Sequence, residues 1–289
     1  MKIVYQGISE TGSRRTVNQD RIGMFAAEDA ALFAVADGMG GHIAGEKASN
    51  EIIFGLKDWW DVHFCRKIEN KEEMFDQTFQ LEDTGTEKME ATQTIGEDGV
   101  NDFSSYVKSL SSRIEQINQK IYQIYNGKEI CGSTVVILFL YKGEYAILWA
   151  GDSRIYEKTR FSFSQLSVDD TWSEMAKRTK KFSESAINRH PDRDKLLNAV
   201  GTFSRLEFAI TKGTLKKQQM FFLCSDGIYK SISEKELKRQ IRKLYDRRKK
   251  GFDFKELRKL VYEAGASDNL SAIAVSVECN TAKAKGAGI

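Results

Sequence analysis

The sequence has 289 residues, of which 41% are hydrophobic and 29% charged, and its formal net charge is +3. This length allows one large domain with a sizeable core, and the composition excludes fibrous and intrinsically disordered proteins. No apolar run reaches the length of a signal peptide or the ~20 residues that cross a bilayer, so we expect a cytoplasmic protein that does not bind membranes.

The small net charge conceals two opposed segments. Residues 64–102 carry eleven acidic and four basic side chains, whereas residues 235–259 carry twelve basic and four acidic ones. The acidic segment lacks helical periodicity and is interrupted by glycine, so we predict an exposed insertion that is more mobile than its flanks. The basic segment could bind nucleic acid, but its leucines and isoleucine recur at helical spacing, which favours solvated helices and no nucleic-acid partner.

The four cysteines are far apart and form no metal-binding pattern: Cys65, Cys131, Cys224 and Cys279. No C-x-x-C pair and no cluster with histidine is present, so a zinc site is excluded. We expect these cysteines to be reduced packing residues.

The first half of the chain predicts three strands and two helices. The runs 3–9, 21–27 and 31–37 are typical of β-strands, and we expect them to be neighbours. Apolar residues at helical spacing then predict a helix over 45–63 and a longer helix from Phe103 to about 124, which Gly127 ends.

The second half predicts mostly sheet. Residues 133–152 read as two buried strands with a turn at Lys142 and Gly143, and residues 154–167 continue as a hairpin. Thr171 begins a capping box, so we expect a helical flap over about 171–198. Further capping boxes begin at Ser233 and Asp253.

Buried strands are also predicted at 218–227 and 269–277, and the tail 281–289 should fray. Short hairpin links, rather than strand-helix-strand crossovers, indicate an α+β fold with antiparallel sheets. No composition shift marks a boundary, so we expect a single domain over 1–280.

Four aspartates share one local setting. Asp37, Asp152 and Asp226 each follow an apolar strand, and Asp268 stands just before one. A single Asp-Gly pair usually marks a turn, but four acids at strand ends predict convergence at one edge. Such a cluster needs compensating charge, and carboxylate ligands favour Mg²⁺ or Mn²⁺. A pair of these ions can activate water against a phosphoester.

Six short motifs in order carry a resemblance to a known family. They are Arg15-Thr-Val-Asn18-Gln19-Asp20, Asp37-Gly-Met-Gly-Gly-His42, Cys131-Gly-Ser-Thr134, Gly151-Asp-Ser-Arg154, Ser225-Asp-Gly227 and Ser267-Asp-Asn269. In these the sequence resembles the metal-dependent serine/threonine protein phosphatases of the 2C type, in their bacterial form. The resemblance runs from about Gly7 to Val277. It implies a four-layer α/β/β/α sandwich with the metals at one end.

The resemblance also implies roles for individual residues. Asp37 should bridge two Mn²⁺ or Mg²⁺ ions, the Gly38 carbonyl should bind one, and Asp226 with Asp268 the other. Asp152 aligns with an aspartate that binds a third ion. Arg15 should grip the substrate phosphate.

Other residues of the motifs should act around these ligands. His42 should protonate the leaving oxygen. Asp20 and Gln19 should act through metal-bound water, and Asn269 should lie next to the metal ligands. Many relatives have glutamate where this chain has Gln19, so we expect weaker binding of the second ion at most. Asp170 also departs from the family pattern and receives no role, and His63 and His190 are expected to be structural.

The sequence thus predicts a monomeric signalling enzyme that hydrolyses phosphoserine and phosphothreonine and opposes a serine/threonine kinase. A catalytically weak binding module that keeps the fold is the alternative. Such a module would be expected to lack one of Asp37, Asp226 or Asp268, and this chain retains all three.

Overall fold

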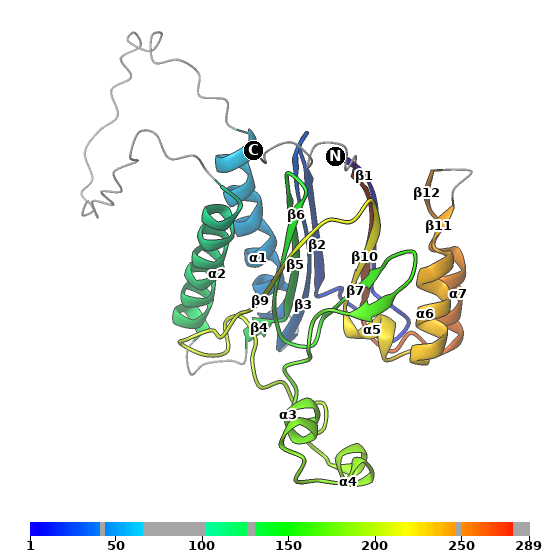
Figure 1. The fold of residues 1–289 in the computed structure, drawn as a ribbon. Helices are drawn as coiled ribbons and strands as arrows, with labels where there is room; N and C mark the ends of the chain where they lie inside the picture. Colours follow the sequence, from blue (N-terminus) through cyan, green and yellow to red (C-terminus); the bar gives the residue numbers. More distant parts are fainter. Residues whose placement is uncertain (41–43, 66–101, 126–130, 247–249, 280–289) are drawn as a thin grey trace, which may run out of the picture.

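Two antiparallel sheets lie face to face, and helices cover the outer side of each (Figure 1). The computed structural model describes residues 1–40, 44–65, 102–125, 131–246 and 250–279. Within these ranges the predicted α+β sandwich of four layers is confirmed.

The two sheets divide most of the strands between them. One sheet has the order β2-β3-β5-β6-β9, with β4 paired to β3 as its sixth strand: β2 (Asp20–Ala26), β3 (Ala30–Gly40), β4 (Cys131–Ser133), β5 (Val135–Tyr141), β6 (Glu144–Ala150) and β9 (Ala209–Thr214). The other has the order β1-β13-β10-β7-β8: β1 (Lys2–Glu10), β7 (Arg154–Lys158), β8 (Phe163–Gln165), β10 (Gln218–Cys224) and β13 (Leu270–Glu278). A separate two-stranded ribbon joins β11 (Tyr245–Asp246) to β12 (Gly251–Phe252).

The helices form the two outer layers and one projection. α1 (Ala44–Trp60) and α2 (Phe103–Tyr125) pack on the six-stranded sheet, while α6 (Glu234–Lys243) and α7 (Lys255–Glu263) cover the other. The short α5 (Asp226–Tyr229) follows β10 directly. At the same end of the sheets, α3 (Trp172–Thr179) and α4 (Glu184–Arg189) extend away from the sandwich (Figure 1).

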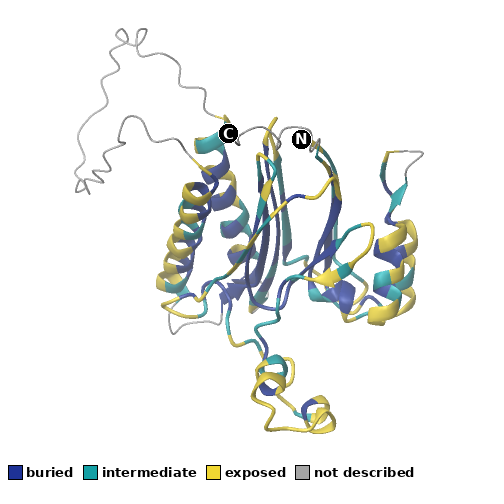
Figure 2. Ribbon diagram, viewed as in Figure 1, coloured by how far each residue is buried: buried dark blue, intermediate teal, exposed yellow. Residues whose placement is uncertain are grey.

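Three hydrophobic layers hold the sandwich together. One lies between α1, α2 and the six-stranded sheet, one between the sheets, and one between the five-stranded sheet and α5 to α7. Figure 2 accordingly shows dark, buried strands in the middle and exposed outer helix faces. Because β3, β5 and β10 are covered on both faces, they are apolar along nearly their whole length. Rigid central strands therefore position the residues that follow them.

Most predicted elements are confirmed, with three corrections. β1 does not neighbour β2 in a sheet but pairs with β13, since its partner comes from the far end of the chain. β9 was not predicted, because this edge strand alternates half-buried and exposed residues around Gly213. The caps at Thr171 and Ser233 are confirmed, whereas α7 has Phe254 as its N-cap, and Asp253 accepts from the Lys255 N–H instead.

The acidic insertion begins later than the sequence suggests. Phe64 belongs to a π-helical turn (Asp61–Cys65) after α1, and its ring lies 4.5 Å from that of Trp60 and 5.0 Å from that of Tyr106. Phe64 is partly buried and packs against the core. Residues 66–101, the tail 281–289 and Gly127 lie outside the described residues. Among the described helices, none is long and apolar enough to cross a membrane.

Candidate active site

A cavity of about 230 Å³ lies at the end of the sheets where β3 and β10 finish. All four strand-end aspartates line it, together with residues from the flap segment and from both sheets. The lining residues are Arg15, Gln19, Asp37, Gly38, Met39, Gly40, Thr134, Asp152, Asp194, Leu196, Asp226, Lys230, Asp268 and Asn269. The convergence predicted from strand ends is thus observed.

Asp37 lies inside its strand rather than at the end of it. β3 continues to Gly40, because Gly38 to Gly40 pair with β4. In the neighbouring strand β2, Asp20 is the direct cross-strand partner of Asp37. Side chains of such a pair lie about 5 Å apart on the same face. The sheet register therefore places two carboxylates side by side.

Asp20 is only 1% exposed, and its two oxygens differ. Oδ2 accepts a hydrogen bond from Ser225 Oγ at 2.7 Å. Oδ1 is buried and has no hydrogen-bond partner among the described residues. Burial raises the pKa of Asp20 to about 6. A buried carboxylate oxygen without a partner is costly unless a proton or a cation is nearby.

The charge is most concentrated at Asp37. Burial raises its pKa well above the usual range, and Asp20, Asp226, Asp152 and Asp268 raise it further. Burial likewise raises the pKa of Asp226, and Asp152 contributes. The cavity therefore favours either protons or cations at these carboxylates.

Lys230 supplies one cation from the chain itself. Its Nζ donates to Asp226 Oδ2 at 2.7 Å and to Asp152 Oδ2 at 3.1 Å. Tyr229 donates its hydroxyl to the same oxygen of Asp152 at 3.1 Å. One ammonium group thus offsets part of the negative charge of the Asp152–Asp226 pair.

Arg15 supplies the second cation. Its Nε and Nη2 donate to Asp268 Oδ1 and Oδ2 at 2.8 and 2.9 Å, a bidentate pair. Half of the Arg15 side chain is exposed, so the guanidinium stands at the cavity mouth. The resemblance assigns Arg15 to the substrate phosphate, whereas in this structure it forms an ion pair with Asp268.

The glycines of the Asp-Gly pairs are required by close packing. A Cβ atom at Gly38 would lie 2.2 Å from the Gly45 carbonyl oxygen, and one at Gly227 would lie 1.9 Å from that of Asn269. Any larger residue would push these segments apart. The glycines thus allow the loops around Asp37 and Asp226 to pack closely.

Gln19 and Asn269 join the N-terminal and C-terminal segments. Asn269 Oδ1 accepts from the Gln19 N–H at 2.9 Å, and its Nδ2 donates to the carbonyls of Thr11 and Val17. Gln19 Nε2 is buried and without a partner in the described part of the chain. Asn269 therefore fixes the loop that carries Arg15 and Gln19.

Asp170, which received no role from the sequence, supports the loop that carries Asp152. Its Oδ2 accepts from the Gly151 N–H at 2.9 Å and from Asn198 Nδ2 at 3.0 Å. Asp169 beside it binds Arg154 at 2.6 Å. These contacts tie the flap segment to the β6–β7 loop.

His42, the expected acid, lies outside the described residues, as do its neighbours Gly41 and Ile43. The other two histidines pack against tryptophans. His63 Nδ1 donates to the Trp59 carbonyl oxygen at 2.7 Å, and the ring of His190 stacks on that of Trp172 with the ring centres 3.7 Å apart. Their expected structural role is consistent with these contacts.

The residues present fit a hard cation. As they stand, no three His, Cys, Asp or Glu side chains of the described ranges are close enough to hold one ion. Lys230 and Arg15 engage three of the four cavity aspartates. The buried, unpartnered oxygen of Asp20 and the crowding of Asp37 nevertheless leave negative charge that the chain does not balance.

The four-layer fold and the aspartate-lined cavity suit a hydrolase that binds metal ions. The family model for "Protein phosphatase 2C" matches residues 10–261. The serine/threonine phosphatase stp of Listeria welshimeri is 26% identical over 234 residues, which cover 79% of each chain. The chain belongs to the protein phosphatase 2C family, whose members are phosphoprotein phosphatases.

Solved structures share the fold. The serine/threonine phosphatase of S. agalactiae superposes with a TM-score of 0.72 at 20% identity, covering 96% of this chain and 100% of that one. The catalytic domain of the phosphatase PstP in complex with two manganese ions gives 0.67 at 20% identity, with 96% and 100% coverage. At these identities the likeness shows the fold.

Proposed function

We propose that this protein hydrolyses phosphoserine and phosphothreonine on other proteins with two divalent cations bound at Asp37, the Gly38 carbonyl, Asp226 and Asp268. The observation that supports this most is the excess of negative charge around Asp37, in a cavity that four aspartates line. When bound, the ions supply an activated water and polarise the phosphoryl group. PstP, which shares the fold, binds manganese in its solved complex, so Mn²⁺ is the first ion to test.

Three residues of the chain support the metal ligands. Asp20 and Gln19 lie beneath the cavity in β2 and the preceding loop, and each carries a buried polar atom without a partner among the described residues. Such atoms can orient water molecules around an ion. Asn269 holds this loop against β13 and so maintains the spacing between Asp37 and Asp268.

Arg15 binds the substrate phosphate in this proposal. Its guanidinium lies at the cavity mouth and is half exposed, so an incoming phosphate can reach it. Arg15 must then exchange at least part of its bidentate contact with Asp268 for the phosphate oxygens. That exchange also frees Asp268 oxygens for a cation.

His42 protonates the leaving serine or threonine oxygen. This role rests on its position in the Asp37-Gly-Met-Gly-Gly-His42 motif. His42→Ala should lower kcat about 100-fold on a phosphothreonine peptide and much less on an aryl phosphate, whose leaving group needs little protonation. Equal losses on both substrates would remove His42 from the mechanism.

The decisive test uses the purified full chain and a phosphothreonine peptide. Phosphate release should require Mn²⁺ or Mg²⁺ and should stop in excess chelator. A phosphorylated protein from a serine/threonine kinase pathway is the expected natural partner, with the enzyme acting as a monomer.

A second candidate function follows from Lys230 and Arg15. Because these cations already engage Asp152, Asp226 and Asp268, weak metal binding would leave a regulatory module that binds phosphoproteins without hydrolysing them. Peptide binding without phosphate release at millimolar Mn²⁺ would favour this alternative.

A further inference from the structure

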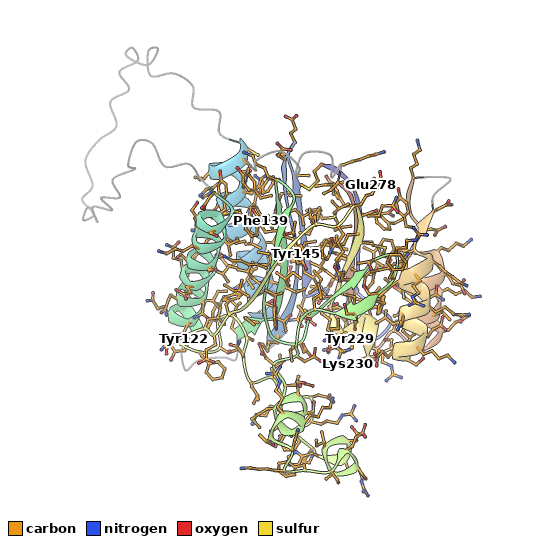
Figure 3. All side chains as sticks on the ribbon, viewed as in Figure 1. Tyr122, Phe139, Tyr145, Tyr229, Lys230 and Glu278 are labelled. Atoms are coloured by element: carbon orange, nitrogen blue, oxygen red, sulfur yellow. The ribbon has the colours of Figure 1, made fainter. Side chains whose placement is uncertain are left out.

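The ammonium group of Lys230 lies between two carboxylates of the candidate active site. Lys230 caps the C-terminus of α5, one turn after Asp226. Its Nζ lies 2.7 Å from Asp226 Oδ2 and 3.1 Å from Asp152 Oδ2. Figure 3 shows Lys230 beside Tyr229 at the end of the sheets from which the flap extends.

The position of Lys230 is fixed by its surroundings. Its backbone N–H donates to the Asp226 carbonyl at 2.9 Å, so the helical turn sets its distance from that residue. Tyr229, the next residue, donates to Asp152 Oδ2, and the Arg154 guanidinium lies 3.6 Å from the centre of the Tyr229 ring. Arg154 is in turn bound to Asp169. The Lys230 side chain is 41% exposed, and its two carboxylate contacts hold the ammonium at the edge of the cavity.

The contacts compete with a metal ion for the same oxygens. A divalent ion such as Mg²⁺ lies about 2.1 Å from each carboxylate oxygen it binds. Lys230 Nζ donates hydrogen bonds to Oδ2 of both Asp152 and Asp226. An ion bound to those oxygens would be a close neighbour of a like charge, which is unfavourable. One group, either the ammonium or an ion, fits between these two atoms.

We propose that Lys230 is a built-in cation that takes the place of a third divalent ion at Asp152 and holds Asp152 and Asp226 in position. This inference rests on the proposed two-metal function. In this proposal Asp152 binds the Lys230 ammonium in place of the third ion that the resemblance implies for it. The chain then binds two ions, and Asp226 keeps Oδ1, which Lys230 does not contact, for metal binding.

The test counts the ions bound per chain. Equilibrium dialysis at saturating Mn²⁺, followed by metal analysis, should give two ions for the wild-type protein. Lys230→Asp and Lys230→Met should each bind three, because both remove the ammonium. Lys230→Arg keeps the charge and should bind two. Lys235→Asp is the matched control for Lys230→Asp. Lys235 is exposed on α6, and both substitutions change the net charge by the same amount.

A further variant identifies the third ion. Adding Asp152→Asn to Lys230→Met should lower the number of Mn²⁺ ions bound per chain from three to two. Three ions in the wild type, or two in the folded Lys230→Met variant, would overturn the proposal. If Lys230→Asp does not fold, Lys230→Met decides the outcome.

The count is independent of catalysis. A protein that binds two ions but releases no phosphate from the peptide refutes the proposed function and leaves the role of Lys230 standing. An active wild type that binds three ions refutes the role of Lys230 and leaves the phosphatase function standing.

Discussion

Two pairs of carboxylates share one cavity, and they differ in how their charge is balanced. Asp152 and Asp226 hold Lys230 between them. Asp20 and Asp37 are paired across β2 and β3, and no Lys or Arg of the described ranges bonds to either. The difference indicates where an external cation is needed: at the Asp20–Asp37 pair, at the cavity end of the six-stranded sheet.

The largest effect should come from Asp37. Asp37→Asn should lower kcat/KM for a phosphothreonine peptide at least about 10³-fold, because the whole metal centre depends on this carboxylate. Asp226→Asn should remove most of the activity as well. The measurement is phosphate release at saturating Mn²⁺, with the exposed Asp29→Asn as the control. Activity of Asp37→Asn within tenfold of wild type would place the metal elsewhere.

The second effect concerns the stability of the metal-free protein. The pKa of Asp20 is raised to about 6 from an ordinary 3.8, so the folded protein keeps a proton that the unfolded chain releases. This contribution to the free energy of unfolding is complete below about pH 4 and is lost as the pH rises through 6. The loss should reach about 3 kcal/mol.

Urea unfolding in excess chelator between pH 4 and 7.5 measures this loss. Asp20→Asn should reduce the pH dependence by the contribution of Asp20, because the amide does not titrate, while the raised pKa values of Asp37 and Asp226 keep theirs. Mn²⁺ should restore stability to the wild type at pH 7.5. Superimposable pH profiles for wild type and Asp20→Asn would show that the Asp20–Asp37 side needs no compensation.

The third effect tests Arg15, the other cation of the cavity. Arg15→Ala should raise KM for the peptide about tenfold, as expected for losing a charged hydrogen bond to phosphate. It should change kcat little and leave Mn²⁺ affinity unchanged or higher, because Asp268 loses a competitor. Arg14→Ala at the exposed neighbouring position is the control. Lower Mn²⁺ affinity in Arg15→Ala would show that Arg15 positions Asp268 for the metal.

The smallest effect is expected for Asp152→Asn, which tests whether the two carboxylate pairs have different roles. Asp152→Asn should lower kcat/KM less than about tenfold. This is the low end of the losses expected when the mutated group acts through another residue. Its partner Lys230 retains the contact with Asp226 in this variant. A loss for Asp152→Asn as large as that for Asp226→Asn would mean that Asp152 contacts the reacting groups.

The sequence predicted the carboxylate pairs better than the groups that balance them. Strand patterns located Asp37, Asp152, Asp226 and Asp268, because buried apolar runs are strong local signals. Lys230 was missed, although it stands four residues after Asp226, the spacing at which helical side chains meet. Its contact with Asp152 depends on how β6 and β10 are placed in the two sheets, which no local pattern encodes. The same holds for Asp20 and Ser225, and for β1 pairing with β13.

The contacts between Arg15 and Asp268 and between Gln19 and Asn269 join residues about 250 positions apart. Asp20 and Ser225 are separated by 205 positions. Folding slows as contacting residues lie farther apart in the chain, since loop closure must precede the contact. During synthesis, Asp268 and β13, the partner strand of β1, leave the ribosome near the end. Until then the growing chain can form neither the cavity nor the β1–β13 pair. If Asp268 binds metal as proposed, productive metal loading comes last, and bound metal reports that both ends of the chain have folded together.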